Sequence, residues 1–118
     1  MSPAQSAAAF ETLRHAHDRV PQRALWADVE TFAWEGPPNQ PTSPLIPAPF
    51  SRVKEQLAAV SPFVDTILIY QYQGLMNKPG SRAFAGHPDS TRLYTDYLNW
   101  HKRNARNVLR SPKTIEQR

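Results

Sequence analysis

Two carboxylates on one short apolar segment are the residues of this chain best suited to chemistry. Residues 24–32 read ALWADVETF, and Asp28 and Glu30 stand two positions apart within it. Alternate side chains of an extended strand point to the same face, so Asp28 and Glu30 share the face opposite Val29. Removing a carboxylate from water without a partner is costly, so their presence on an apolar segment needs a reason.

Two interpretations of this pair stay open. In the first, Asp28 and Glu30 form salt bridges or line the rim of a sheet. In the second, Glu30 projects from the carboxyl end of a strand into a cleft, where a glycosidase places an acid, a base or a nucleophile. Such hydrolysis generally needs a second carboxyl group roughly 5 to 9.5 Å away. Asp28 lies deeper on the strand and Glu35 follows it, so the second group could also come from strands outside this chain.

Aromatic residues follow both apolar segments of the chain. Trp34 comes just after the segment with Glu30, and Tyr72 lies at the end of residues 64–73. Flat aromatic faces bind sugar rings, although such side chains also pack in cores. The interpretation as a carbohydrate site therefore has Glu30 as its catalytic residue and Asp28, Trp34, Glu35 and Tyr72 as its substrate-binding residues.

Composition excludes several other chemistries. The chain has no cysteine, so it has no disulfide, thiolate metal site or cysteine nucleophile. His15 and His17 stand two apart on a predicted helix and point to different sides, which is poor geometry for a metal. With only four glycines the chain has no phosphate-binding glycine loop. We expect neither a metal ion nor a cofactor.

The net charge of +4 belongs to the C-terminal residues. Residues 1–101 carry eight Lys and Arg against nine Asp and Glu, whereas residues 102–118 carry six against one. This basic segment could contact phosphates, but it has no aromatic side chain for base stacking, and a solvated tail is the alternative. No apolar run approaches the roughly 18 residues of a membrane span. The first residues also lack the pattern of a signal peptide, so we expect a soluble chain.

The hydrophobic periodicity predicts an alternation of helices and strands. Ser2, Pro3 and Gln5 form the start signal of a helix that ends near Val20 and buries a stripe containing Phe10, Leu13, His17 and Val20. The remaining predicted elements are a strand over residues 24–32, a helix over 50–60, a strand over 64–73 and a helix from Asp89 or Ser90 to about Asn104.

Six of the twelve prolines fall within residues 33–49, where we expect no regular structure. This connection and residues 74–88 both leave a strand, whereas the connections that enter strands are about three residues long. Long loops at the carboxyl ends of strands build the sites of parallel α/β proteins. The sequence therefore predicts a helix-strand-helix-strand-helix chain with two parallel strands, whose free edges need neighbours.

Three strings of residues resemble the C-terminal part of the bacterial, glycosidase-like barrels named domain of unknown function 4434. These strings are LWADVE at residues 25–30, LIPAPF followed by RVKEQL within residues 45–57, and VSPFVD at residues 60–65. The resemblance covers residues 8–102. It implies a partial (β/α)8 barrel in which residues 24–32 and 64–73 form the last two strands. In related retaining glycosidases the penultimate strand ends in the nucleophilic Glu, which implies that role for Glu30.

Two functional hypotheses follow. In the first, residues 1–104 are the last strand-helix units of a glycoside-hydrolase-like barrel that acts on or binds carbohydrate, and the fragment is inactive alone. Missing barrel strands or self-association then cover its sheet edges, and residues 105–118 form a basic, weakly ordered tail. In the second, the chain is a non-enzymatic interaction module whose basic tail contacts an acidic partner or nucleic acid.

Overall fold

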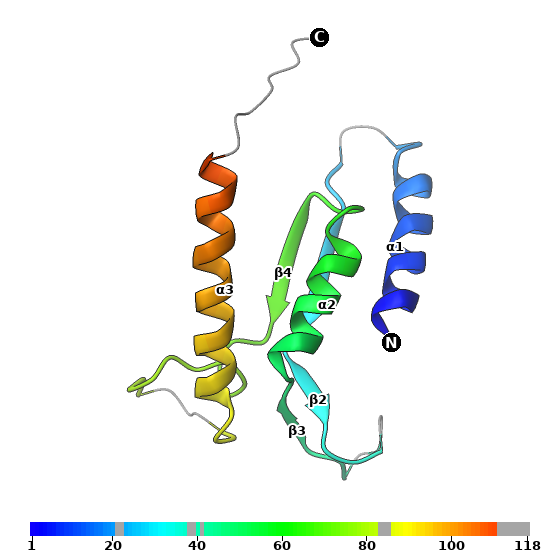
Figure 1. The fold of residues 1–118 in the computed structure, drawn as a ribbon. Coiled ribbons are helices and arrows are strands. Elements are labelled where there is room, and N and C mark those ends of the chain that lie inside the picture. The colour runs from blue at the N-terminus through cyan, green and yellow to red at the C-terminus, as the bar shows by residue number, and fades with distance from the viewer. Residues whose placement is uncertain (21–22, 38–39, 41, 83–85, 111–118) are drawn as a thin grey trace.

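A computed structural model describes residues 1–20, 23–37, 40, 42–82 and 86–110 of the chain. Within these residues the protein is a mixed α/β structure (Figure 1). Its elements, in chain order, are α1 (Pro3–His17), β1 (Trp26–Glu30), β2 (Phe32–Trp34), β3 (Leu45–Pro47), α2 (Phe50–Val60), β4 (Thr66–Tyr70) and α3 (Ser90–Arg110).

The predicted parallel strand pair is present. β1 pairs with β4 in parallel, with Trp26 opposite Thr66 and Glu30 opposite Tyr70. Along β1 the side chains alternate between exposed and buried, as the sequence pattern predicts. The strands are shorter than predicted, and no third strand joins this pair in the part of the chain that the structure describes. Both outer edges of the pair therefore keep unpaired backbone groups.

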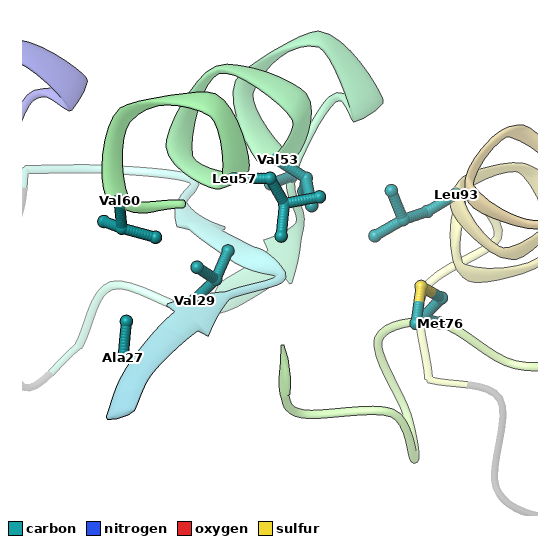
Figure 2. Packing of buried hydrophobic residues seen from close by; sticks show 8 residues of the cluster. Ala27, Val29, Val53, Leu57, Val60, Met76 and Leu93 are labelled. Atoms are coloured by element: carbon teal, nitrogen blue, oxygen red, sulfur yellow. The ribbon is translucent and has the colours of Figure 1, made fainter. Parts of the chain in front are cut away.

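Helix α2 covers one face of this strand pair. Its buried residues Val53, Leu57 and Val60 recur at helical spacing and point toward Ala27 and Val29 of β1 (Figure 2). Leu93 of α3 and Met76 of the loop after β4 belong to the same buried cluster and lie on the side where α3 packs (Figure 2). The periodicity of residues 50–60 thus determines which face of α2 packs on the strand pair.

The opposite face of the pair is open. Trp26 is 56% exposed, Leu68 48% and Tyr70 54%, although all three are large apolar or aromatic side chains. They alternate along the strands with the more buried residues, so these three exposed side chains lie together on one face. Glu30 and Asp28 lie on this same face.

The expectation of no regular structure in residues 33–49 is wrong. β2 and β3 pair antiparallel, with Phe32 opposite Pro47 and Trp34 opposite Leu45. β2 also begins within the predicted strand 24–32, which breaks in two at Thr31. Proline is tolerated in β3 because the pair has only two strands, and a residue at the end of an edge strand need not donate to a partner.

Helix α1 begins as predicted but buries its apolar stripe only in part, since Phe10 packs half-buried against the core. The Ser2 hydroxyl accepts from the Gln5 backbone N–H at 3.2 Å, and the Gln5 side chain accepts from the Ser2 backbone N–H at 2.9 Å. However, α1 has no buried residue, and Leu13 and Val20 are exposed. The helix packs against α2 but has no second neighbour among the described elements that could cover this stripe.

Helix α3 continues to Arg110, past the predicted end near Asn104. Its aromatic residues face the rest of the molecule, and the Trp100 ring lies 6.1 Å from that of Phe50 on α2. The division of the chain at residue 104 remains a prediction, because residues 111–118 lie outside the described part. None of the described helices is long and apolar enough to cross a membrane.

Candidate functional site

Glu30 is the last residue of β1, and its side chain is exposed. Its backbone carbonyl accepts a hydrogen bond from the Gln56 side chain on α2 at 3.2 Å, which fixes the strand end to the helix. The carboxylate itself forms no salt bridge with the residues that the structure describes. The salt-bridge interpretation of Glu30 therefore has no support in the described structure, and the carboxylate is available to solvent.

Glu30 lines a hollow of about 590 Å³ at the carboxyl end of β1. This volume lies in the range of small-molecule sites, which is about 300 to 1,000 Å³. The indole of Trp34 on β2 is half-buried and lines the same hollow. The other lining residues are Met1, Ser2, Phe32, Ala33, Gly36 and Arg52.

The structure does not bring the other three predicted residues into this hollow. Asp28 is exposed on the face of Glu30, two residues nearer the start of β1. Glu35 is exposed beyond β2, and its backbone N–H donates to the Pro44 carbonyl at 3.0 Å. Tyr72 packs edge-on against Tyr94 of α3, with the ring centroids 6.1 Å apart. Among the described residues, Glu30 is the sole carboxylate in the lining of the hollow.

Hydrogen bonds between Thr31 and Gln71 join the carboxyl ends of the two parallel strands. Thr31 is fully buried, and its hydroxyl donates to the Gln71 carbonyl at 2.7 Å and accepts from the Gln71 N–H at 2.9 Å. The Thr31 N–H donates to the Tyr70 carbonyl at 2.8 Å, and this carbonyl belongs to the cis Tyr70–Gln71 peptide bond. The strand pattern places Thr31 on the same face as Val29 but carries no signal for its hydrogen-bond partner.

Arg52 is a site residue that the sequence did not reveal. It lies in the first turn of α2, is half-buried and lines the hollow together with Glu30. Its Nε atom is shielded from solvent and has no hydrogen-bond partner. A possible signal is its place directly after a loop that leaves a strand, because such helix starts face the carboxyl end of the sheet.

A second polar cluster lies at the amino end of the strands. The Asp65 carboxylate accepts from the Leu25 N–H and from the Arg14 guanidinium, both at 2.8 Å. The hydrogen bond from Leu25 and then that from Arg14 hold the pKa of Asp65 below its ordinary value. Asp65 in turn raises the pKa of Arg14. Arg14 also donates to the Phe63 carbonyl at 2.7 Å, so this cluster connects α1 to β4.

The described residues contain no group of three or more His, Asp or Glu side chains that could hold a metal ion. The arrangement offers one carboxylate and one guanidinium without described partners, together with an indole, around an open hollow. Such groups can bind a polar ring through hydrogen bonds and stacking.

Comparison with known proteins identifies the family. The model of the family described as domain of unknown function (DUF4434) matches residues 2–83. The chain belongs to this family. No curated protein matches it.

A solved structure from Bacteroides thetaiotaomicron VPI-5482, described as a "putative alpha-L-fucosidase", has a similar fold. The TM-score is 0.64 at 18% sequence identity, and the match covers 86% of this chain and 28% of that chain. The DUF4434 chain thus spans little more than a quarter of that solved structure. At this identity the likeness concerns the fold, and function has to be argued from the site.

Proposed function

We propose that this chain is the C-terminal part of a glycosidase-like (β/α)8 barrel that binds or acts on carbohydrate. Two parallel strands with a helix over one face are the repeating unit of such barrels. The partial coverage of the glycosidase-like neighbour supports this proposal, as does the open face that the pair would turn to the barrel interior. Residues 1–104 would form the last strand-helix units, and residues 105–118 a basic tail.

Glu30 is the proposed catalytic carboxylate. The observation that carries this role is its position at the carboxyl end of a parallel strand, where it lines a hollow together with Trp34. Trp34 would stack on the sugar ring, whereas Asp28, Glu35 and Tyr72 would contact parts of a glycan that extend beyond the hollow. Since glycoside hydrolysis uses two carboxyl groups, the chain would be inactive until other strands supply the second one.

The free edges of the pair define the partners that we propose. Missing barrel strands, from another polypeptide region or from a second copy, would pair with β1 and β4 and cover Trp26 and Leu68. The alternative of an interaction module with a basic tail is not favoured, because the comparison points to a glycosidase-like fold.

The Glu30→Gln variant of the full chain tests the proposed role. The carboxylate has no described partner, so the substitution should leave the unfolding midpoint unchanged. Loss of a charged acceptor should weaken sugar binding by about 10- to 100-fold. The measurement is ligand-observed NMR titration with a panel of monosaccharides that includes L-fucose.

Glu55→Gln is the matched control, because Glu55 is exposed on α2 and does not line the hollow. It should bind sugar as the parent does. Unchanged sugar affinity in Glu30→Gln would refute the proposed role of Glu30.

A further inference from the structure

Arg52 is a cation without a partner in the lining of the proposed sugar site. No described residue accepts a hydrogen bond from its guanidinium, and it takes part in no described salt bridge. A shielded donor without an acceptor is costly, and native proteins usually pair such groups with protein, water or ligand. The guanidinium carries five N–H donors and stays charged at every physiological pH. An anionic acceptor is therefore the group that this position lacks.

The start of α2 adds to the positive charge of Arg52. The first turn of α2 contains no acidic residue, and its N-cap residue Pro49 has no side chain that could accept from the helix. The positive end of the helix dipole therefore adds to the charge of Arg52. Glu30 lines the same hollow but forms no salt bridge with Arg52, so neither charge neutralises the other.

We propose that Arg52 binds the carboxylate of an acidic sugar, such as a uronic acid, in the hollow beside Glu30. A carboxylate matches the planar fork of a guanidinium, which can donate two parallel hydrogen bonds to its oxygens. Trp34 would lie against the apolar face of the ring, and Glu30 would accept from a ring hydroxyl. This inference rests on the proposed carbohydrate function and deepens it, because it names the class of sugar.

Partial burial of Arg52 is what makes the side chain selective. An exposed arginine would hold an anion weakly, because both ions are hydrated and screened. The packing that shields Nε also limits the rotation of the guanidinium plane, so less entropy is lost on binding. A neutral sugar of the same shape would leave these donors unpaired, and the hollow should discriminate against it.

The test compares D-glucuronate, L-fucose and glucose 6-sulfate as ligands of the full chain in ligand-observed NMR titrations. Glucuronate should bind about 10-fold or more tightly than fucose, because a charge-assisted hydrogen bond is worth more than a neutral one. Arg52→Gln should remove this preference, because the affinity for glucuronate should fall by much more than the affinity for fucose. Arg52→Lys, which keeps the charge but lacks the fork, should restore only part of it. Circular dichroism checks that each variant folds.

Lys54→Gln is the matched control, because Lys54 is exposed on the same helix and does not line the hollow. It should keep the full preference for glucuronate. Equal affinity for glucuronate and fucose, or a preference that survives in Arg52→Gln, would overturn the role of Arg52 while leaving the carbohydrate function intact. Tighter binding of the sulfated sugar would overturn the carboxylate assignment. Absence of binding by all three sugars would overturn both proposals.

Discussion

Charged residues gather at the two ends of the parallel strand pair, and the two groups differ in their partners. At the carboxyl end, Glu30 and Arg52 line one hollow without pairing. At the amino end, Arg14 and Asp65 pair with each other at 2.8 Å. In barrel enzymes the carboxyl end carries the chemistry and the amino end carries stability. Under the proposed barrel assignment, the paired cluster would contribute to stability and the unpaired groups to the site.

The amino-end cluster predicts an acid-sensitive part of stability. The folded-state pKa of Asp65 lies below its ordinary value of 3.8. Its contribution to the free energy of unfolding is therefore complete above that pH and falls as the pH drops through the folded-state pKa. We expect Asp65→Asn to unfold with a shallower pH dependence between about pH 5 and pH 3. Urea unfolding at a series of pH values measures this slope.

The Arg14→Gln variant separates the two hydrogen bonds to Asp65. The Leu25 N–H, which is the larger cause of the lowered pKa, remains in this variant. Arg14→Gln should therefore keep part of the acid dependence that Asp65→Asn loses. Identical slopes for Asp65→Asn and the parent protein would contradict the prediction.

The sequence predicted some of these residues and missed others for a physical reason. The strict alternation of β1 was enough to place Glu30 and Asp28 on the exposed face, because the period of a strand is fixed by its geometry. The roles of Arg52 and Thr31 depend on which elements lie beside them in space. Those neighbours are distant in sequence, so no local pattern reveals them.

At the scale of elements, the carboxyl ends of β1 and β4 are joined by side-chain hydrogen bonds as well as by the ladder. Thr31 follows β1 directly and is 0% exposed, and its hydroxyl satisfies both backbone groups of Gln71 after β4. Its own carbonyl accepts from the Ala48 N–H after β3 at 2.8 Å. One residue thus holds the parallel pair and the antiparallel pair in a fixed relation, and Glu30 is its neighbour.

Thr31→Val should lower the free energy of unfolding by about 1 to 3 kcal/mol, because valine leaves the part-buried N–H and carbonyl of Gln71 without their partner. Thr31→Ser keeps the hydroxyl and removes one methyl group, so it should cost about 1 kcal/mol or less. Urea unfolding of both variants gives the comparison. Equal losses would show that packing, and not the hydrogen bonds, makes Thr31 important.

The elements with a clear apolar period were predicted well. Helix α2 spans residues 50–60 as predicted, and the strands β1 and β4 fall inside their predicted ranges. The pair β2 and β3 was missed because its stability comes from pairing between distant residues and from Thr31, whereas the local sequence is rich in proline. Leu13 and Val20 were predicted to be buried but are exposed. An amphipathic pattern shows which face of a helix can be buried, and not whether a neighbour is present to cover it.

At the scale of the whole molecule, helices cover one face of the strand pair, and no described element covers the other. The buried cluster lies between α2, β1 and the residues that α3 and the loop after β4 contribute. The other face of the strand pair has no covering element in the described part of the chain and exposes large apolar side chains. Leu57 and Leu68 therefore offer a comparison between the same residue type on the covered and on the open side.

Leu57→Ala should destabilise the chain by about 2 to 5 kcal/mol, because it leaves a cavity in the buried cluster. In the chain without a partner, Leu68→Ala should change the free energy of unfolding by about 0.5 kcal/mol or less, because the side chain is already 48% exposed and borders no packed layer. Urea unfolding at two protein concentrations measures both. A large and concentration-dependent loss for Leu68→Ala would show that another polypeptide surface covers the open face in solution. In a complete barrel, Leu68→Ala should likewise cause a larger loss of unfolding free energy. The face that is open in this chain would then be packed in the barrel interior.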